Sequence, residues 1–206
     1  MLREPAEADD VTIRYAWVNE IEAMTVAIVR GSTSAQVLDV YGGNPTSVGD
    51  YPFAQLADLQ GDGTDMRFHV QFIDLDDRVV VLENNGWSGS LPEIARRCSA
   101  DGGEFFSVYW NVNGFGLVTA ADDGTVTARF EHLYPYAPQA APHEVRPDWA
   151  IGPEVEVETA TQVCFALMEQ RTGVEFDPSW LAVRRPTYQV PDPHWLYRRV
   201  EGADKP

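Results

Sequence analysis

Cysteine is scarce in this chain, where only Cys98 and Cys164 occur among 206 residues. We expect both on the buried faces of separate helices, where a thiol behaves as a small hydrophobic group. Two isolated cysteines cannot build the disulfide framework of a small secreted domain, and such sparse use suits a reducing compartment. The sequence therefore predicts a protein without a disulfide.

Long apolar runs are missing as well. No stretch of about 18 consecutive apolar residues occurs, so no membrane-spanning helix is predicted. The N-terminus, MLREPAEADD, lacks a basic region followed by an apolar stretch, so no signal peptide is expected. These absences predict a soluble cytoplasmic protein whose residues 1–10 form an acidic, disordered tail.

Basic residues are few, since 15 Lys and Arg stand against 32 Asp and Glu and the formal net charge is −17. Nucleic acids and anionic membranes are bound through Lys and Arg, so neither is an expected partner. The acidity can serve solubility, or it can form a negative face that meets a partner protein with a basic face. Composition leaves both interpretations open and says nothing of the oligomeric state.

Motifs of known enzymes and metal sites are also absent from the sequence. It has no P-loop and no Gly-x-Gly-x-x-Gly after a strand, and the Gly-Trp-Ser-Gly run at 86–89 lacks the spacing of a nucleophile elbow. The four histidines lie far apart, and the acidic turn around Asp58 and Asp62 lacks the Glu that an EF-hand requires. We therefore predict no catalytic residue, no metal site and no cofactor.

The residues that are present indicate a folded domain. Hydrophobic residues make up 44% and aromatic residues 11%, including six Trp, which suffices to bury a core. Alternating or β-branched apolar runs predict six strands, and apolar stripes at helical spacing predict three or four helices. The strands are expected near 24–30, 68–72, 79–82, 106–112, 115–120 and 126–130, and the helices near 33–41, 53–59, 90–98 and 160–172.

The links between these strands are short, which predicts a mostly antiparallel sheet. We expect one α+β domain over residues 11–185, with about six strands and the helices packed on one face. The proline-rich segment 186–206 is expected to be a tail that packs partly back. Two pairs, Ser90 with Glu93 and Thr159 with Gln162, have the spacing of a helix capping box.

One block of the chain combines asparagine with tryptophan at two predicted strand ends. Amides donate and accept hydrogen bonds, and Trp adds a flat apolar ring, so together they can bind a polar ligand or a partner's backbone. Turn chemistry is the competing interpretation, because Asn tolerates positive φ and bonds loop backbone, and because Trp110 alternates onto the core face. The candidate binding residues are Asn84, Asn85, Trp87, Trp110, Asn111 and Asn113.

This block, with the Val-Arg-Gly strand end at 29–31 and the Leu-Met-Glu-Gln-Arg-Thr-Gly-Val helix end at 167–174, resembles a family of uncharacterised actinobacterial proteins. Its members share E-x-N-G-[WF]-x-G-x-x-P-E, then SV-[YF]-W-N-V-N, and a late E-R-x-T-G-V helix. The resemblance covers residues 17–185 and implies an actinobacterial, cytoplasmic protein with no assigned activity to carry over. This chain departs from the pattern at Asn84-Asn85, where a single Asn before Gly is more usual, which leaves the role of Asn84 open.

Three functions compete on these observations. The first is a non-enzymatic interaction protein, such as an immunity or conflict-system component that binds a partner protein. The second is a small-molecule-binding module that uses the Asn/Trp cluster on the sheet. The third is a hydrolase whose site is assembled by the fold, which requires two or more of Glu83, Glu93, Asp122 and His132 to converge in one cleft.

Overall fold

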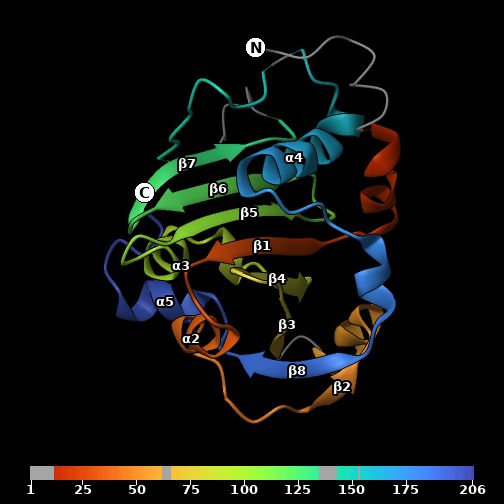
Figure 1. The fold of residues 1–206 in the computed structure, drawn as a ribbon, viewed down its shortest axis with the longest axis vertical. Helices are drawn as coiled ribbons and strands as arrows, with labels where there is room; N and C mark the ends of the chain where they lie inside the picture. Colours follow the sequence, from red (N-terminus) through yellow and green to blue (C-terminus); the bar gives the residue numbers. More distant parts are fainter. Residues whose placement is uncertain (1–11, 62–65, 135–142, 153) are drawn as a thin grey trace.

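Eight strands form a single antiparallel sheet in the order β2-β8-β3-β4-β1-β5-β6-β7 (Figure 1). The computed structural model describes residues 12–61, 66–134, 143–152 and 154–206. The strands are β1 (Met24–Arg30), β2 (Gly49–Tyr51), β3 (Phe68–Asp74), β4 (Arg78–Asn84), β5 (Glu104–Trp110), β6 (Gly116–Asp122), β7 (Thr125–Glu131) and β8 (Arg185–Val190).

The six predicted strands are all present, but the predicted count of six is wrong because β2 and β8 are added. Strand β2 has only three residues, too few for a periodic pattern. Strand β8 carries Pro186, which ordinarily argues against an inner strand. Here Pro186 pairs only with Asp50 of β2, beyond the four residues of β8 that pair with β3, so its missing N–H leaves no bond to β3 unmade.

Four α-helices and four short 3₁₀ helices lie wholly within the described residues, more helical segments than predicted. Three 3₁₀ helices of five residues or fewer account for most of the excess, because they are too short to show an apolar stripe. The α-helices are α2 (Ser34–Val40), α3 (Pro92–Cys98), α4 (Val157–Thr172) and α5 (His194–Arg199), and the 3₁₀ helices are η1 (Ala16–Glu20), η2 (Phe53–Leu59), η3 (Ser88–Ser90) and η4 (Pro178–Ala182). No described helix is long and apolar enough to cross a membrane.

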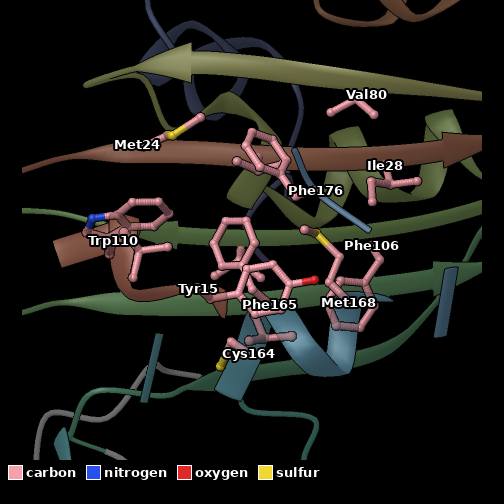
Figure 2. Close-up of a cluster of buried hydrophobic side chains, with 14 of the residues drawn as sticks. Tyr15, Met24, Ile28, Val80, Phe106, Trp110, Cys164, Phe165, Met168 and Phe176 are labelled. Carbon is pink, nitrogen blue, oxygen red and sulfur yellow. The ribbon is translucent and has the colours of Figure 1, made fainter. Parts of the chain in front are cut away.

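Helices cover both faces of the sheet, so the prediction that they pack on one face is wrong. On one face, Val26 and Ile28 of β1 belong to a core that includes Phe165 and Met168 of α4. Figure 2 shows Ile28, Phe165 and Met168 in this core. On the other face, Ala27 and Val29 pack with α2, α3 and α5. The central strands are apolar at consecutive positions, and a strand of that kind must be buried on both faces.

The two cysteines lie in these two cores, as predicted. Cys98 of α3 and Cys164 of α4 are both buried and free, on opposite faces of the sheet. Burial raises the pKa of both thiols far above the ordinary value, so neither is present as a reactive thiolate at neutral pH. They serve as small apolar side chains.

Both predicted capping boxes are absent. Helix α3 begins at Pro92, whose ring favours the first helical position, so Ser90 falls before the helix and its Oγ donates to Trp87 O at 2.8 Å. Helix α4 begins at Val157, two residues before Thr159, whose Oγ1 donates to Glu156 O at 3.1 Å. Serine or threonine spacing alone did not locate either helix start.

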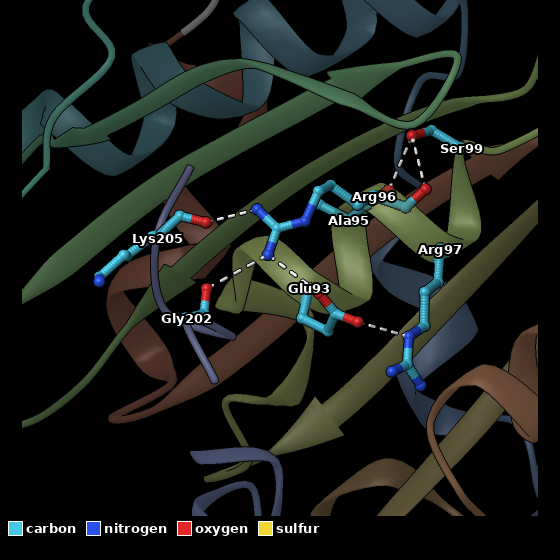
Figure 3. A network of polar contacts seen from close by, with 7 residues as sticks. All are labelled: Glu93, Ala95, Arg96, Arg97, Ser99, Gly202 and Lys205. Atoms are coloured by element: carbon cyan, nitrogen blue, oxygen red, sulfur yellow. Dashed lines mark hydrogen bonds and ion pairs between the residues drawn. The ribbon is translucent and has the colours of Figure 1, made fainter. Parts of the chain in front are cut away.

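The last residues of the chain pack against α3 (Figure 3). The backbone N–H of Glu93 donates to Ala203 O at 3.0 Å, and Arg96 donates to the carbonyl oxygens of Gly202 and Lys205. The Glu93 carboxylate accepts from Arg96 at 2.9 Å and from Arg97 at 2.7 Å. These contacts hold the residues that follow α5 against α3.

Candidate functional site

A buried carboxylate organises the loop between β4 and α3. Glu83 is 1% exposed, and its two carboxylate oxygens accept the backbone N–H groups of Ser88 at 2.9 Å and Gly89 at 2.7 Å. Burial raises the pKa of Glu83 to about 7, although the two backbone bonds act in the opposite direction. The first residue of the block therefore shapes the loop from inside.

Glycine is required at two positions of this loop. A Cβ at Gly86 would lie 2.7 Å from Glu83 Oε2, and a Cβ at Gly89 would lie 2.8 Å from Tyr41 Oη. Neighbouring strands hold the carbonyl groups of the same two glycines, because Thr25 Oγ1 donates to Gly86 O and Ser107 Oγ to Gly89 O, both at 2.7 Å. The Gly-Trp-Ser-Gly sequence thus fits the carboxylate closely.

The two adjacent asparagines connect β4 to η2. Asn84 Nδ2 donates to Phe53 O at 3.1 Å, which gives this residue a structural contact. Asn85 adopts φ of +50°, and its Nδ2 donates to Gln60 Oε1 at 3.1 Å. The Asn85 side chain is nevertheless exposed, so part of the amide faces solvent.

The second strand end is a turn built by Asn111. Its Oδ1 accepts the backbone N–H of Asn113 at 2.9 Å and of Phe115 at 3.3 Å, and its Nδ2 donates to Tyr109 Oη at 2.8 Å. Trp110 points to the opposite face, where it is 6% exposed and its Nε1 donates to Ile21 O at 2.8 Å. Trp110 is therefore a core residue, as its alternation predicts.

Four of the six candidate residues come together around one pocket of about 500 Å³, which we call the Asn–Trp pocket. Asn84 lies outside it and borders a neighbouring pocket, whereas Trp110 is in the core. The residues that line the Asn–Trp pocket are Met66, Phe68, Asn85, Trp87, Tyr109, Asn111, Val112, Asn113, Asp192 and His194.

One wall of the Asn–Trp pocket comes from the C-terminal segment. The imidazole of His194 meets the indole of Trp87 edge to face at 4.9 Å between ring centroids, and Tyr197 lies 5.9 Å from the same indole. Sequence reasoning missed Asp192 and His194 as lining residues. The aromatic residues of the segment signalled only that it packs back.

A second, larger pocket of about 640 Å³ adjoins the first, and we call it the Trp17 pocket. Asn85 and Val112 line both pockets, so the two pockets border each other at these residues. Sequence reasoning missed this pocket, because its walls come from five separate segments. The residues that line the Trp17 pocket are Trp17, Glu20, Ile21, Glu22, Ala23, Phe53, Ala54, Ala57, Gln60, Asn84, Asn85, Val112, Pro178 and Leu181.

The four groups that a hydrolase site would need do not converge in the described part of the chain. Glu83 is enclosed by its loop, Glu93 pairs with arginines on α3, and Asp122 is exposed and accepts from Thr127. His132 is buried against α4 on the other face, where burial lowers its pKa to about 3. The described residues also hold no group of three or more His, Cys, Asp or Glu that could bind a metal ion.

Comparison with known families gives one match, which covers most of the chain. The family described as a family of unknown function, DUF6461, matches residues 8–190. No curated protein and no solved structure matches the chain. The resemblance to an uncharacterised family is thus confirmed at the level of the family, and the chain belongs to DUF6461.

Proposed function

We propose that this chain is a non-enzymatic binding protein that holds a segment of a partner protein in the Asn–Trp pocket. One observation carries the proposal: residues from two separate strand ends and from the C-terminal segment surround a single open pocket. An immunity protein that neutralises a toxin is one form of such a function.

The chemistry of the pocket wall suits a polypeptide. The Asn113 side chain is exposed and makes no hydrogen bond to any described residue, so its amide is available to a peptide backbone. Val112 is 66% exposed and Met66 46%, two of the few large apolar side chains left in solvent in the described chain. Apolar contact area beside free amides is what a bound segment needs.

The charge of the pocket favours a basic partner over an acidic one. No Lys or Arg is among the described residues that line it, and Asp192 supplies a carboxylate. The whole chain carries a net charge of −17, which attracts cationic partners at long range and repels anionic ones. This agrees with a partner protein that presents a basic face.

A display library of random peptides, selected on the purified chain, tests the proposal. Selected peptides are expected to lose about tenfold in affinity with Val112→Ser or Asn113→Ala, which corresponds to about 1.4 kcal/mol in calorimetry. Val48→Ser is the matched control, because Val48 is also exposed but lines neither pocket. If no peptide is enriched, or if Val48→Ser weakens binding as much as Val112→Ser, the proposal is wrong.

A small polar molecule is the second candidate ligand, and the pocket volume favours it. Small-molecule sites measure about 300–1,000 Å³, and the Asn–Trp pocket at about 500 Å³ lies within that range. A thermal-shift screen with polar metabolites separates the two candidates. A metabolite that stabilises the native chain but not Asn113→Ala supports this second function.

A further inference from the structure

We infer that the Trp17 pocket receives a cationic side chain, lysine or arginine, of the segment that the Asn–Trp pocket holds. The inference rests on the proposed function for the presence of that segment. The position, the charge and the apolar walls of the pocket support the inference, and binding to the pocket can be tested without the partner.

The Trp17 pocket lies beside the Asn–Trp pocket. Asn85 and Val112 belong to the lining of both pockets, so a chain lying in one crosses directly into the other over these two residues. The far walls are η1 and the residues after it, η2, and η4. A single extended segment can therefore contact both pockets at once.

The charges of the Trp17 pocket are all of one sign. Glu20 and Glu22 line it, and no Lys, Arg or His is among its described lining residues. Both glutamates are exposed, and neither forms an ion pair with any described residue. By contrast, Glu93, Glu104 and Glu169 each pair with an arginine. Two carboxylates without an internal partner favour an external cation and repel an anion.

The apolar part of the remaining wall suits the stem of a long basic side chain. Ile21, Ala54, Ala57 and Leu181 are apolar and carry no group that would have to be desolvated at a cost. Lysine and arginine bury their methylene stems against surfaces of this kind while the charged end stays near carboxylates in solvent. An uncharged apolar side chain would use the walls but leave both glutamates unpaired.

The indole ring of Trp17 offers a spectroscopic reporter for this pocket. Trp17 lines the Trp17 pocket but not the Asn–Trp pocket. In two-dimensional ¹H–¹⁵N spectra of the full chain, we expect its indole signal to shift with N-acetyl-arginine methylamide or N-acetyl-lysine methylamide. The neutral analogues built on citrulline and norleucine are expected to cause much smaller shifts.

Variants in which the two glutamates lose their charge provide a second test of the inference. Glu20→Gln with Glu22→Gln is expected to weaken binding of the arginine probe about fivefold, because exposed ion pairs contribute little individually. Glu158→Gln with Glu201→Gln removes the same charge from exposed sites that line neither pocket, and should change the affinity less than about twofold. Thermal unfolding of both double variants verifies that they are folded.

The outcomes separate this inference from the proposed function. If neutral and cationic probes shift the Trp17 signal equally, or if the two double variants behave alike, the inference is wrong. If selected peptides depend on Asn113, which lines only the Asn–Trp pocket, yet lack Lys and Arg, the inference fails and the proposed function stands. If the cationic probes bind as expected but no peptide depends on Asn113, the proposed function fails alone.

Discussion

At the scale of single residues, Gly89 occupies a position with no room for a methyl group. A Cβ there would approach Tyr41 Oη to 2.8 Å, Thr25 Cγ2 to 3.0 Å and Glu83 Oε1 to 3.1 Å. We expect Gly89→Ala to lower the free energy of unfolding by about 1–3 kcal/mol, the usual cost of overpacking a core. Urea unfolding of the variant and the native chain measures this difference.

Removing the hydroxyl group of Tyr41 tests whether its contact with the added methyl group causes the loss of stability. Tyr41 Oη is buried with no hydrogen-bond partner among the described residues, so Tyr41→Phe alone should cost little. Combined with Gly89→Ala, it should restore part of the lost stability by relieving the closest contact. A double variant as unstable as Gly89→Ala alone would show that Tyr41 is not the obstacle.

Glu83 gives the molecule an unusual dependence on pH. Its pKa rises from 4.5 to about 7 on folding, because burial penalises the carboxylate more than the backbone bonds stabilise it. Between these two values the folded state keeps a proton that the unfolded state has lost. Stability therefore falls as pH rises through this window, by about 3 kcal/mol from this group.

Glu83→Gln isolates that contribution, since glutamine carries no titrating proton. The unfolding free energy of the native chain relative to the variant should decrease between pH 4.5 and pH 7 and stay level on either side. Urea unfolding of both proteins at several pH values yields the difference. Glu93 and Glu104, whose pKa values are lowered mainly through their arginine partners, act in the opposite direction but cancel in this comparison. A flat difference would contradict the assignment.

At the scale of elements, the contact between the C-terminal segment and α3 depends on Arg96. Its guanidinium donates to Gly202 O at 3.4 Å, to Lys205 O and to the Glu93 carboxylate at 2.9 Å. We expect Arg96→Ala to speed amide hydrogen exchange over residues 201–205 about tenfold, because hydrogen bonds from a charged donor are stronger than those between neutral groups. Mass spectrometry of exchange resolves this segment.

Arg97→Ala is the matched control for Arg96→Ala. Arg97 is the next residue of the same helix and also pairs with Glu93, at 2.7 Å, but it makes no hydrogen bond to the C-terminal residues that the structure describes. An exposed pair of this kind is worth about 0–1 kcal/mol and should leave exchange at 201–205 unchanged. Equal effects of the two variants would show that helix α3, and not Arg96, holds the segment.

The central elements were predictable from sequence because their signals are local. The alternation of Phe106 with Val108 marks β5 without reference to any other strand, and the turn at Asp123-Gly124 has the positive φ that its residues predict. Strand β8 exists through pairing with β3, more than a hundred residues earlier, so no pattern within 185–190 reveals it.

The candidate site was also predictable in part. Asn85 and Trp87 follow β4, and Asn111 and Asn113 follow β5, so grouping by residue type found the pocket wall that two strand ends form. Asp192 and His194 reach the wall from the other end of the chain. Trp110 was grouped with the pocket residues by type, although its alternation already predicts the core face. Asn84 bonds Phe53 O of η2, a distant contact that no local pattern reveals.

At the scale of the whole molecule, the net charge of −17 works against folding. Like charges are closer together in the compact state than in the unfolded chain, and salt screens their repulsion. The screening length falls from about 10 Å at 0.1 M to about 3 Å at 1 M. The unfolding temperature should therefore rise between low salt and 0.5 M NaCl, which calorimetry measures.

The affinity of a cationic probe for the Trp17 pocket should fall as the salt concentration rises, whereas the unfolding temperature should increase. The pocket presents two exposed carboxylates that form no ion pair with any described residue, so screening removes attraction there while it relieves repulsion elsewhere. Titrating N-acetyl-arginine methylamide at 0.05 M and 0.5 M NaCl should show affinity falling severalfold over the range in which the unfolding temperature rises. Sodium sulfate at equal ionic strength controls for salt exclusion from the surface, which raises stability without acting through charge. Affinity that rises with salt, or a severalfold fall that persists in Glu20→Gln with Glu22→Gln, would mean that the two glutamates do not hold the probe.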